Sequence, residues 1–171
     1  MFDSAQTRSA IPAIVTWGRL PLETRKYLMK ILVPTDGSKA ALHAVKYAIA
    51  LLGMLESKKS NSITLVSVHD DAGLRHAKAL VGREAIADYL RELSDKELKP
   101  ARKILDQAGV RHDMEMRTGH VWQEIVDCAR KGKFDLIVLG AKGRSAITDL
   151  LLGSVAQRVL AGSEMPVLFV K

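Results

Sequence analysis

The stretch LIVLGAKGRSAITDLLLGSVAQRVL, residues 136–160, contains a strand pattern, a glycine-containing loop and a helix pattern in that order. Residues 136–139 are apolar and rich in β-branched side chains, which indicates a strand buried on both faces. Three glycines divide the segment that follows, namely Gly140, Gly143 and Gly153. A helix is expected to begin at or near Ser154, with an apolar stripe formed by Val155, Val159 and Leu160.

The same succession of strand and helix recurs along the chain from Met29 onward. Buried strands are predicted at 31–33, 63–68 and 167–170, and a weaker alternating pattern at 111–117 would suit an edge strand. Strands that alternate with helices imply right-handed crossovers. The sequence therefore predicts an α/β fold, a doubly wound parallel sheet with helices on both faces.

Three further helices are predicted between these strands. Ser38 is expected to cap the first, whose apolar face comprises Ala41, Leu42, Val45, Ile49 and Leu52. A long polar-rich helix should run from about Arg83 to Ala108, broken near its start and stopped by Gly109. Its inward residues are expected to be Ile86, Leu90, Leu98 and Leu105. The third helix carries a stripe formed by Val121, Ile125 and Ala129.

Length and composition limit the classes of protein to consider. A chain of 171 residues fits one domain, predicted here over 29–171, and the longest uncharged apolar stretch is far shorter than the ~20 residues of a membrane span. Residues 1–28 form an N-terminal extension that is a flexible tail, an ordered arm or a segment outside the mature protein. The single cysteine, Cys128, fits a reducing cytoplasm and is expected to be a small buried residue on a helix.

The net charge of +7 does not by itself indicate a nucleic-acid partner. Basic and acidic residues alternate, as in RELSDKELKPARK, and there is no run of five or more basic residues. No aromatic residues are interleaved with basic ones in the way that base stacking requires. We therefore expect neither a nucleic acid nor a membrane as partner, although the charge favours anionic small molecules.

The residues after the first strand are expected to lie at the carboxyl edge of the sheet and are candidates for a ligand site. Pro34 ends the strand, Asp36 places a carboxylate just beyond it, and Gly37 and Ser38 begin a helix. In doubly wound sheets, ligands bind beyond the carboxyl ends of the strands, where the winding direction reverses. The alternative is an ordinary turn in which Asp36 or Ser38 only caps the helix.

The glycine-containing loop after residue 139 has the composition of a phosphate site. Gly140 permits a positive φ or close approach of a ligand to the backbone, and Ser154 lies near a helix N-terminus, which favours anions. Lys142 and Arg144 could add charge-assisted hydrogen bonds. Glycine and serine are also common in ordinary loops, so this prediction depends on these features lying beside Asp36 in one crevice.

Motifs of several common enzyme classes are missing from the sequence. It contains no G-x-x-x-x-G-K-[ST], no G-x-G-x-x-G and no G-x-S-x-G. The five histidines show no metal-ligand spacing with the cysteine, and the VHDD run at 68–71 is expected to be solvated loop more often than a cation site. No catalytic nucleophile or metal site is predicted.

Three segments resemble the nucleotide-binding branch of the universal stress protein family. ILVPTDGSKAALHAVKYAIAL resembles the opening strand and helix of that family, and IVLGAKGRSAITDLLLGSVAQRVLAGSEMPVLFVK resembles its closing half. Gly140, Gly143, Gly153 and Ser154 fit the family's G-x2-G-x9-G-[S/T] signature without a gap. The resemblance extends from Met29 to Lys171.

The resemblance implies a fold like that of the adenine nucleotide alpha-hydrolases, with strand order 3-2-1-4-5, and a site for ATP, or for ADP or AMP, with Mg²⁺. Pro34, Thr35 and Asp36 would hold the base and ribose, and the backbone of Val68 would meet the adenine. Leu139 and Gly140 would flank the ribose and first phosphate. The remaining phosphates would lie among Lys142, Gly143, Arg144, Gly153, Ser154 and Val155. Many relatives have His or Arg at position 142.

The resemblance also implies a cytoplasmic homodimer that pairs through residues 166–170, and a regulator of the stress response with at most weak ATP hydrolysis. Two alternatives remain open at this point. The protein could be a slow ATPase or phosphotransferase, or a dimeric interaction module with an empty cavity. We expect bulky replacements of Gly140 or Ser154 to abolish nucleotide binding and leave the fold intact.

Overall fold

The computed structural model describes residues 28–55, 61–70, 82–143 and 152–171. The described residues form a five-stranded sheet with the order β3-β2-β1-β4-β5. The strands are β1 (Lys30–Pro34), β2 (Ser62–His69), β3 (His112–Thr118), β4 (Leu136–Gly140) and β5 (Val167–Val170). All neighbouring strands are parallel, and Ile31 lies opposite Leu136. The predicted doubly wound sheet and strand order are confirmed, and β1 and β4 are neighbours.

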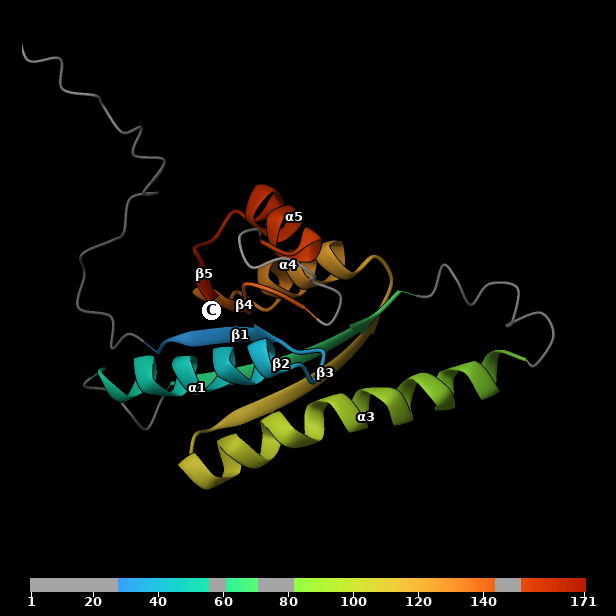
Figure 1. Cartoon of the computed structure of the whole chain (residues 1–171), viewed down its shortest axis with the longest axis horizontal. Coiled ribbons are helices and arrows are strands. Elements are labelled where there is room, and N and C mark those ends of the chain that lie inside the picture. Colours follow the sequence, from blue (N-terminus) through green and yellow to red (C-terminus); the bar gives the residue numbers. More distant parts are fainter. Residues whose placement is uncertain (1–27, 56–60, 71–81, 144–151) are drawn as a thin grey trace, which may run out of the picture.

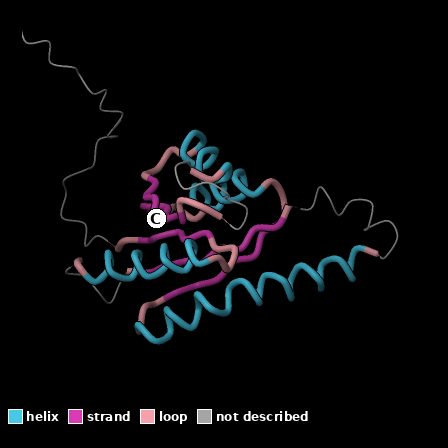
Figure 2. Tube along the Cα trace, in the orientation of Figure 1, coloured by secondary structure: helices cyan, strands magenta, loops and turns pink. Residues whose placement is uncertain are grey.

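Helices cover both faces of this sheet (Figure 1, Figure 2). One face carries α1 (Lys39–Gly53) and α3 (Arg83–Ala108), and the other carries α4 (Val121–Lys131) and α5 (Ser154–Gly162). Within the described ranges, no helix is long and apolar enough to cross a membrane.

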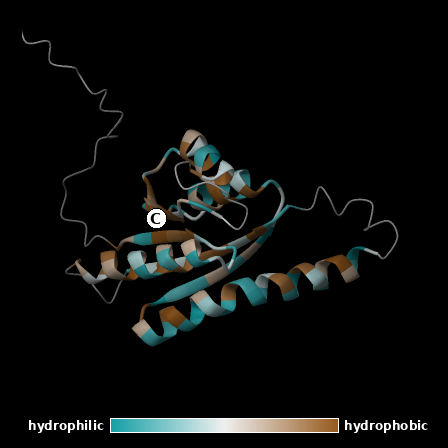
Figure 3. Cartoon of the chain, viewed as in Figure 1, coloured by the Kyte–Doolittle hydropathy of each residue, from teal (hydrophilic) through white to brown (hydrophobic). Residues whose placement is uncertain are grey.

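Each face of the sheet has its own apolar core. Ile31, Val33 and Leu65 lie in the core beneath α1 and α3, whereas Leu32 and Val66 lie in the core beneath α4 and α5. Because successive side chains of a strand point to opposite faces, strands covered on both sides must be apolar at consecutive positions. The hydropathy colouring shows brown within β1 and a largely teal edge strand β3 (Figure 3).

The helix boundaries agree with the predictions, with two corrections. Ser38 caps α1 by accepting a hydrogen bond from the Ala41 N–H at 3.2 Å. The helix α3 is continuous rather than broken, because its buried residues continue at helical spacing from Ile86 to Leu105. Leu160 is 52% exposed and does not belong to the inward stripe of α5, since Ala156 and Val159 occupy the buried positions.

The edge strand β3 is where the alternating sequence pattern predicted it. Met114 and Met116 are about 40% exposed on one face (41% and 40%), while the intervening Glu115 is partly buried on the other. The other edge of the sheet is β5, so the segment near the carboxyl terminus is not a central strand.

Candidate functional site

A cavity of about 410 Å³ opens beyond the carboxyl ends of β1 and β4. Its volume lies within the range of small-molecule sites. The structure brings together all but one of the residues predicted for the site, namely Pro34, Thr35, Asp36, Val68, Leu139, Gly140, Lys142, Gly143, Gly153, Ser154 and Val155. The remaining one, Arg144, lies outside the described residues. The crevice between β1 and β4 that the sequence required is therefore present.

The turn from β1 into α1 is held by hydrogen bonds from its own side chains. The Thr35 hydroxyl oxygen accepts from the Gly37 N–H at 3.2 Å, and Asp36 Oδ1 accepts from the Ser38 N–H at 3.0 Å. The Thr35 N–H donates to the Val66 carbonyl at 2.9 Å, which extends the sheet past Pro34. The Asp36 carboxylate is thereby fixed at the cavity.

The N-terminus of α5 lies on the other side of the same cavity. Its N-cap is Gly153, which has no side chain to accept hydrogen bonds from the first turn. The first N–H groups of a helix have no partner within the helix and carry a positive partial charge. The Gly153 N–H donates to the Ala141 carbonyl at 2.9 Å, so the helix start is tied to the end of β4.

Two glycines of the loop, Gly140 and Gly143, differ in what a side chain at each position would meet. A Cβ at Gly140 would lie 2.9 Å from the Ala40 carbonyl carbon and 3.1 Å from the Ala41 nitrogen, so Gly140 permits α1 to pack closely against β4. A Cβ at Gly143 would lie 3.3 Å from Asp36 Oδ2. Gly140 does not have a positive φ, and its replacement would disturb α1. The expectation of an intact fold is therefore wrong for this residue.

Much of the cavity wall is apolar and was not predicted. It includes Val66 of β2, Val121 and Ile125 of α4, Leu152 just before α5, and Ala156 of α5. The sequence placed Val121 and Ile125 on the inward stripe of their helix. That stripe continues from the core into the cavity, and periodicity alone cannot distinguish core from cavity.

The VHDD run does not behave as solvated loop at its start. His69 is the last residue of β2, its side chain is 11% exposed, and its Nε2 lies 2.9 Å from Ser94 Oγ. Asp70 Oδ2 is 3.8 Å from His120 Nδ1 at the N-cap of α4. Asp71 lies outside the described residues. Within the described part of the chain, no three His, Cys, Asp or Glu side chains could hold a metal ion.

Cys128 is buried on α4, as predicted. Its Sγ donates to Glu115 Oε2 at 3.4 Å. Burial, aided by the negative charge of Glu115, raises the pKa of the thiol to about 11. A protonated, buried thiol is a poor nucleophile. We therefore interpret Cys128 as a residue of the core between α4 and the sheet.

A family model described as "Universal stress protein family" matches residues 28–171 of the chain. Among curated sequences, Universal stress protein MJ0531 of Methanocaldococcus jannaschii is 39% identical over 142 residues, covering 83% of this chain and 81% of that protein.

Solved structures show the same fold. The structure of protein MJ0577 has a TM-score of 0.73 at 28% identity, covering 84% of this chain and 96% of the other. The curated sequence named Universal stress protein MJ0577 is from Methanocaldococcus jannaschii. A universal stress protein in complex with cAMP has a TM-score of 0.61 at 25% identity, covering 84% of this chain and 97% of that one.

Proposed function

The chain belongs to the universal stress protein family, and from that premise we propose that it is a cytoplasmic regulator that binds an adenine nucleotide in the cavity between β1 and β4. The observation that carries the proposal is the composition of this cavity. Asp36, the glycines of the loop, the start of α5 and an apolar wall all line the same space. Each feature alone is common in proteins, but together they match the base, ribose and phosphate of a nucleotide.

The ligand is proposed to lie across the carboxyl edge of the sheet. The base would pack against Val66 and Val68, because apolar side chains at this end of the cavity suit an aromatic ring. Pro34 and Thr35 would line the base, and the Asp36 carboxylate would accept hydrogen bonds from the ribose hydroxyls. Leu139 and Gly140 would flank the ribose and first phosphate.

The phosphates would lie at the N-terminus of α5. Backbone N–H groups and the positive end of the helix dipole favour an anion there. The proposed phosphate-binding residues are Lys142, Gly143, Arg144, Gly153, Ser154 and Val155. We propose ATP as the ligand, or ADP or AMP in its place, with Mg²⁺ held by the phosphates. The relative solved with cAMP supports an adenine nucleotide.

Titration calorimetry with ATP, with and without Mg²⁺, tests the proposal. Asp36→Asn keeps the size of the side chain and removes the charge that would accept from the ribose, so we expect the ATP affinity to fall roughly tenfold, about 1.4 kcal/mol. Asp113→Asn is the matched control, since Asp113 is exposed on β3 and does not line the cavity. A wild-type protein that does not bind ATP would contradict the proposal.

We propose retention of the nucleotide with at most weak hydrolysis. Phosphate release from ATP, followed over hours at several protein concentrations, distinguishes the two activities. A slow ATPase would be indicated instead by steady phosphate release that is proportional to the amount of protein and that is lost in Asp36→Ala.

We further propose that the chain forms a homodimer through 166–170. The strand β5 is a sheet edge, and Val167, Leu168 and Phe169 are only partly buried in the single chain. The Pro166 carbonyl accepts from the Ile137 N–H of β4, so Val167 directs its N–H away from the sheet. Val167→Pro would remove that outward donor at the first residue of the strand, where proline is tolerated.

Light scattering after gel filtration tests this dimer. We expect twice the chain mass for the wild type and the mass of one chain for Val167→Pro, with unchanged circular dichroism. A monomeric wild type, or a variant that remains dimeric, would contradict pairing through this edge.

A further inference from the structure

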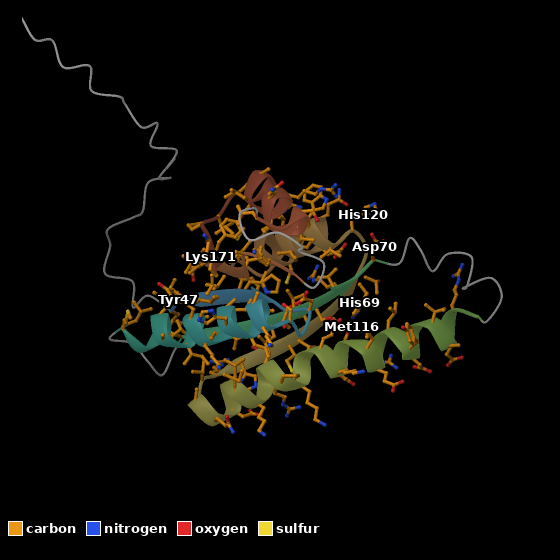
Figure 4. All side chains as sticks on the ribbon, in the orientation of Figure 1. Tyr47, His69, Asp70, Met116, His120 and Lys171 are labelled. Atoms are coloured by element: carbon orange, nitrogen blue, oxygen red, sulfur yellow. The ribbon has the colours of Figure 1, made fainter. Side chains whose placement is uncertain are left out.

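Four polar side chains are buried together between the end of β2 and the middle of α3. Ser67 is 0% exposed, Ser94 1% and Glu97 8%, and the side chain of His69 is 11% exposed. They lie on the face of β2 opposite the cavity, because Ser67 and His69 alternate with the cavity residues Val66 and Val68. Figure 4 places His69 on the side of the sheet that α3 covers, away from the helix α4 that begins after His120.

The hydrogen bonds among these side chains determine where one proton lies. The Ser67 hydroxyl donates to Glu97 Oε2 at 2.9 Å, so its oxygen can only accept from His69 Nε2, 3.1 Å away. His69 Nε2 therefore carries a hydrogen. The same nitrogen lies 2.9 Å from Ser94 Oγ and 3.5 Å from Glu97 Oε2. His69 therefore contacts both helix residues, and Ser67 is bonded to Glu97.

The backbone of Glu97 also touches the turn that carries Asp36. Gly37 has a φ of +73°, and a Cβ there would lie 3.4 Å from Glu97 Cα and 3.6 Å from its carbonyl oxygen. One turn of α3 thus contacts both segments that form the base and ribose end of the cavity. It contacts β2 through side chains and the β1–α1 turn through its backbone.

We propose that Ser67, His69, Ser94 and Glu97 are positioning residues that set the distance between Val68 and Asp36 and so the affinity for the nucleoside half of the ligand. This inference rests on the proposed function. None of the four residues lines the cavity. Their effect is exerted through the strand end and the turn that they hold, because a buried hydrogen-bonded network restrains its members.

The test compares ATP with adenosine, which lacks the phosphates. Glu97→Ala leaves Ser67 and His69 without their shared acceptor, and we expect both affinities to fall by a similar factor, roughly tenfold, as for a lost buried hydrogen bond to a charged group. The ratio of the ATP affinity to the adenosine affinity should stay within about twofold of wild type, since the start of α5 does not contact this network.

Two further variants complete the design. Ser94→Ala removes one partner of His69 and should have the same effect at smaller size, which covers the case in which Glu97→Ala does not fold. Glu92→Ala is the matched control, because Glu92 is exposed on the same helix. Affinities are measured by competition with a fluorescent ATP analogue at a temperature where every variant is folded.

The outcomes separate this inference from the proposed function. Unchanged affinities in folded Glu97→Ala and Ser94→Ala would overturn the positioning role, as would a loss for ATP that exceeds the loss for adenosine. A wild-type protein that binds neither compound would overturn the proposed function and this inference with it. A wild type that binds both, with variants that do not differ from Glu92→Ala, would overturn this inference alone.

Discussion

Two helices begin at the same edge of the sheet, but their N-termini are completed in different ways. At α1, the side chains of Thr35, Asp36 and Ser38 accept hydrogen bonds from backbone N–H groups of the turn and the first helical turn. At α5, the N-cap is Gly153, which offers no such acceptor. The backbone angles of the two caps are similar, φ −69° and ψ 159° at Ser38 against φ −60° and ψ 153° at Gly153.

The difference bears on the proposed function, in which one sheet edge both holds its own chain and binds an anion. Side chains that cap α1 use its donors within the protein, so that helix start is a structural element. A helix start without a capping side chain keeps its donors for a ligand. Under the proposed function, the same backbone geometry would serve two purposes, and the residue at the N-cap would decide which.

The largest effect is expected when α5 is given the kind of cap that α1 has. Gly153→Asp introduces a carboxylate on a Cβ that would meet no atom of the described residues closer than 3.6 Å. It would accept from the first-turn N–H groups and repel phosphate, and we expect ATP affinity to fall roughly a hundredfold, about 2.8 kcal/mol. Gly153→Ser should cap without the charge and cost less affinity. Calorimetry with ATP checks both, and unchanged affinity in Gly153→Asp would contradict a phosphate site at α5.

The next effect concerns stability rather than binding. Gly140→Ala introduces a Cβ 2.9 Å from backbone atoms of α1, and we expect it to lower the free energy of unfolding by about 1–3 kcal/mol. Gly143→Ala is the control in the same loop, because among the described residues its Cβ would meet only Asp36 Oδ2, at 3.3 Å. Urea unfolding measures both. Equal stability of the two variants would mean that α1 does not need the close approach at Gly140.

Removing the side-chain cap of α1 is expected to have the opposite outcome to adding one at α5: a loss of stability with little change in ATP affinity. Ser38→Ala removes the acceptor of the Ala41 N–H, and we expect a loss of about 1 kcal/mol of stability. ATP affinity should change much less than in Gly153→Asp, because Ser38 does not line the cavity. A large loss of affinity with little loss of stability would reverse the roles assigned to the two helix starts.

The smallest effect is expected at Cys128, which does not line the cavity. Its raised pKa of about 11 keeps the thiol protonated, so at pH 8 we expect slow reaction with a thiol reagent when folded and fast reaction in urea. The ionised form is disfavoured in the folded protein, so this contribution to stability is complete below the ordinary thiol pKa and is lost as pH rises towards 11. Rapid reaction of the folded protein would show that α4 opens readily.

The sequence predicted those parts of the fold whose signals are local. Consecutive apolar residues in β1, β2, β4 and β5 indicate strands buried on both faces, and Ser38 precedes its helix directly. The spacing of Gly140, Gly143 and Gly153 indicated the loop of the site. These patterns depend on neighbours in the chain, so they can be read without knowing which elements pack together.

The features that escaped prediction depend on contacts between distant segments. Glu97 resembles the other charged residues of its helix, and its buried partner Ser67 lies 30 residues away. The role of Gly140 depends on the backbone of α1, which the sequence of the loop does not contain. Leu160 fits a helical stripe by spacing, but α5 is short, and Ala156 and Val159 already occupy its buried side.

The most direct test of the central claim is the identity of what the protein retains during purification. The protein is purified without added nucleotide, denatured, and the released compounds are identified by chromatography and mass spectrometry. We predict an adenine nucleotide at about one molecule per chain for the wild type, and much less for Gly153→Asp. A wild-type protein that releases no nucleotide and does not bind added Mg-ATP would contradict the assignment of the cavity as a nucleotide site.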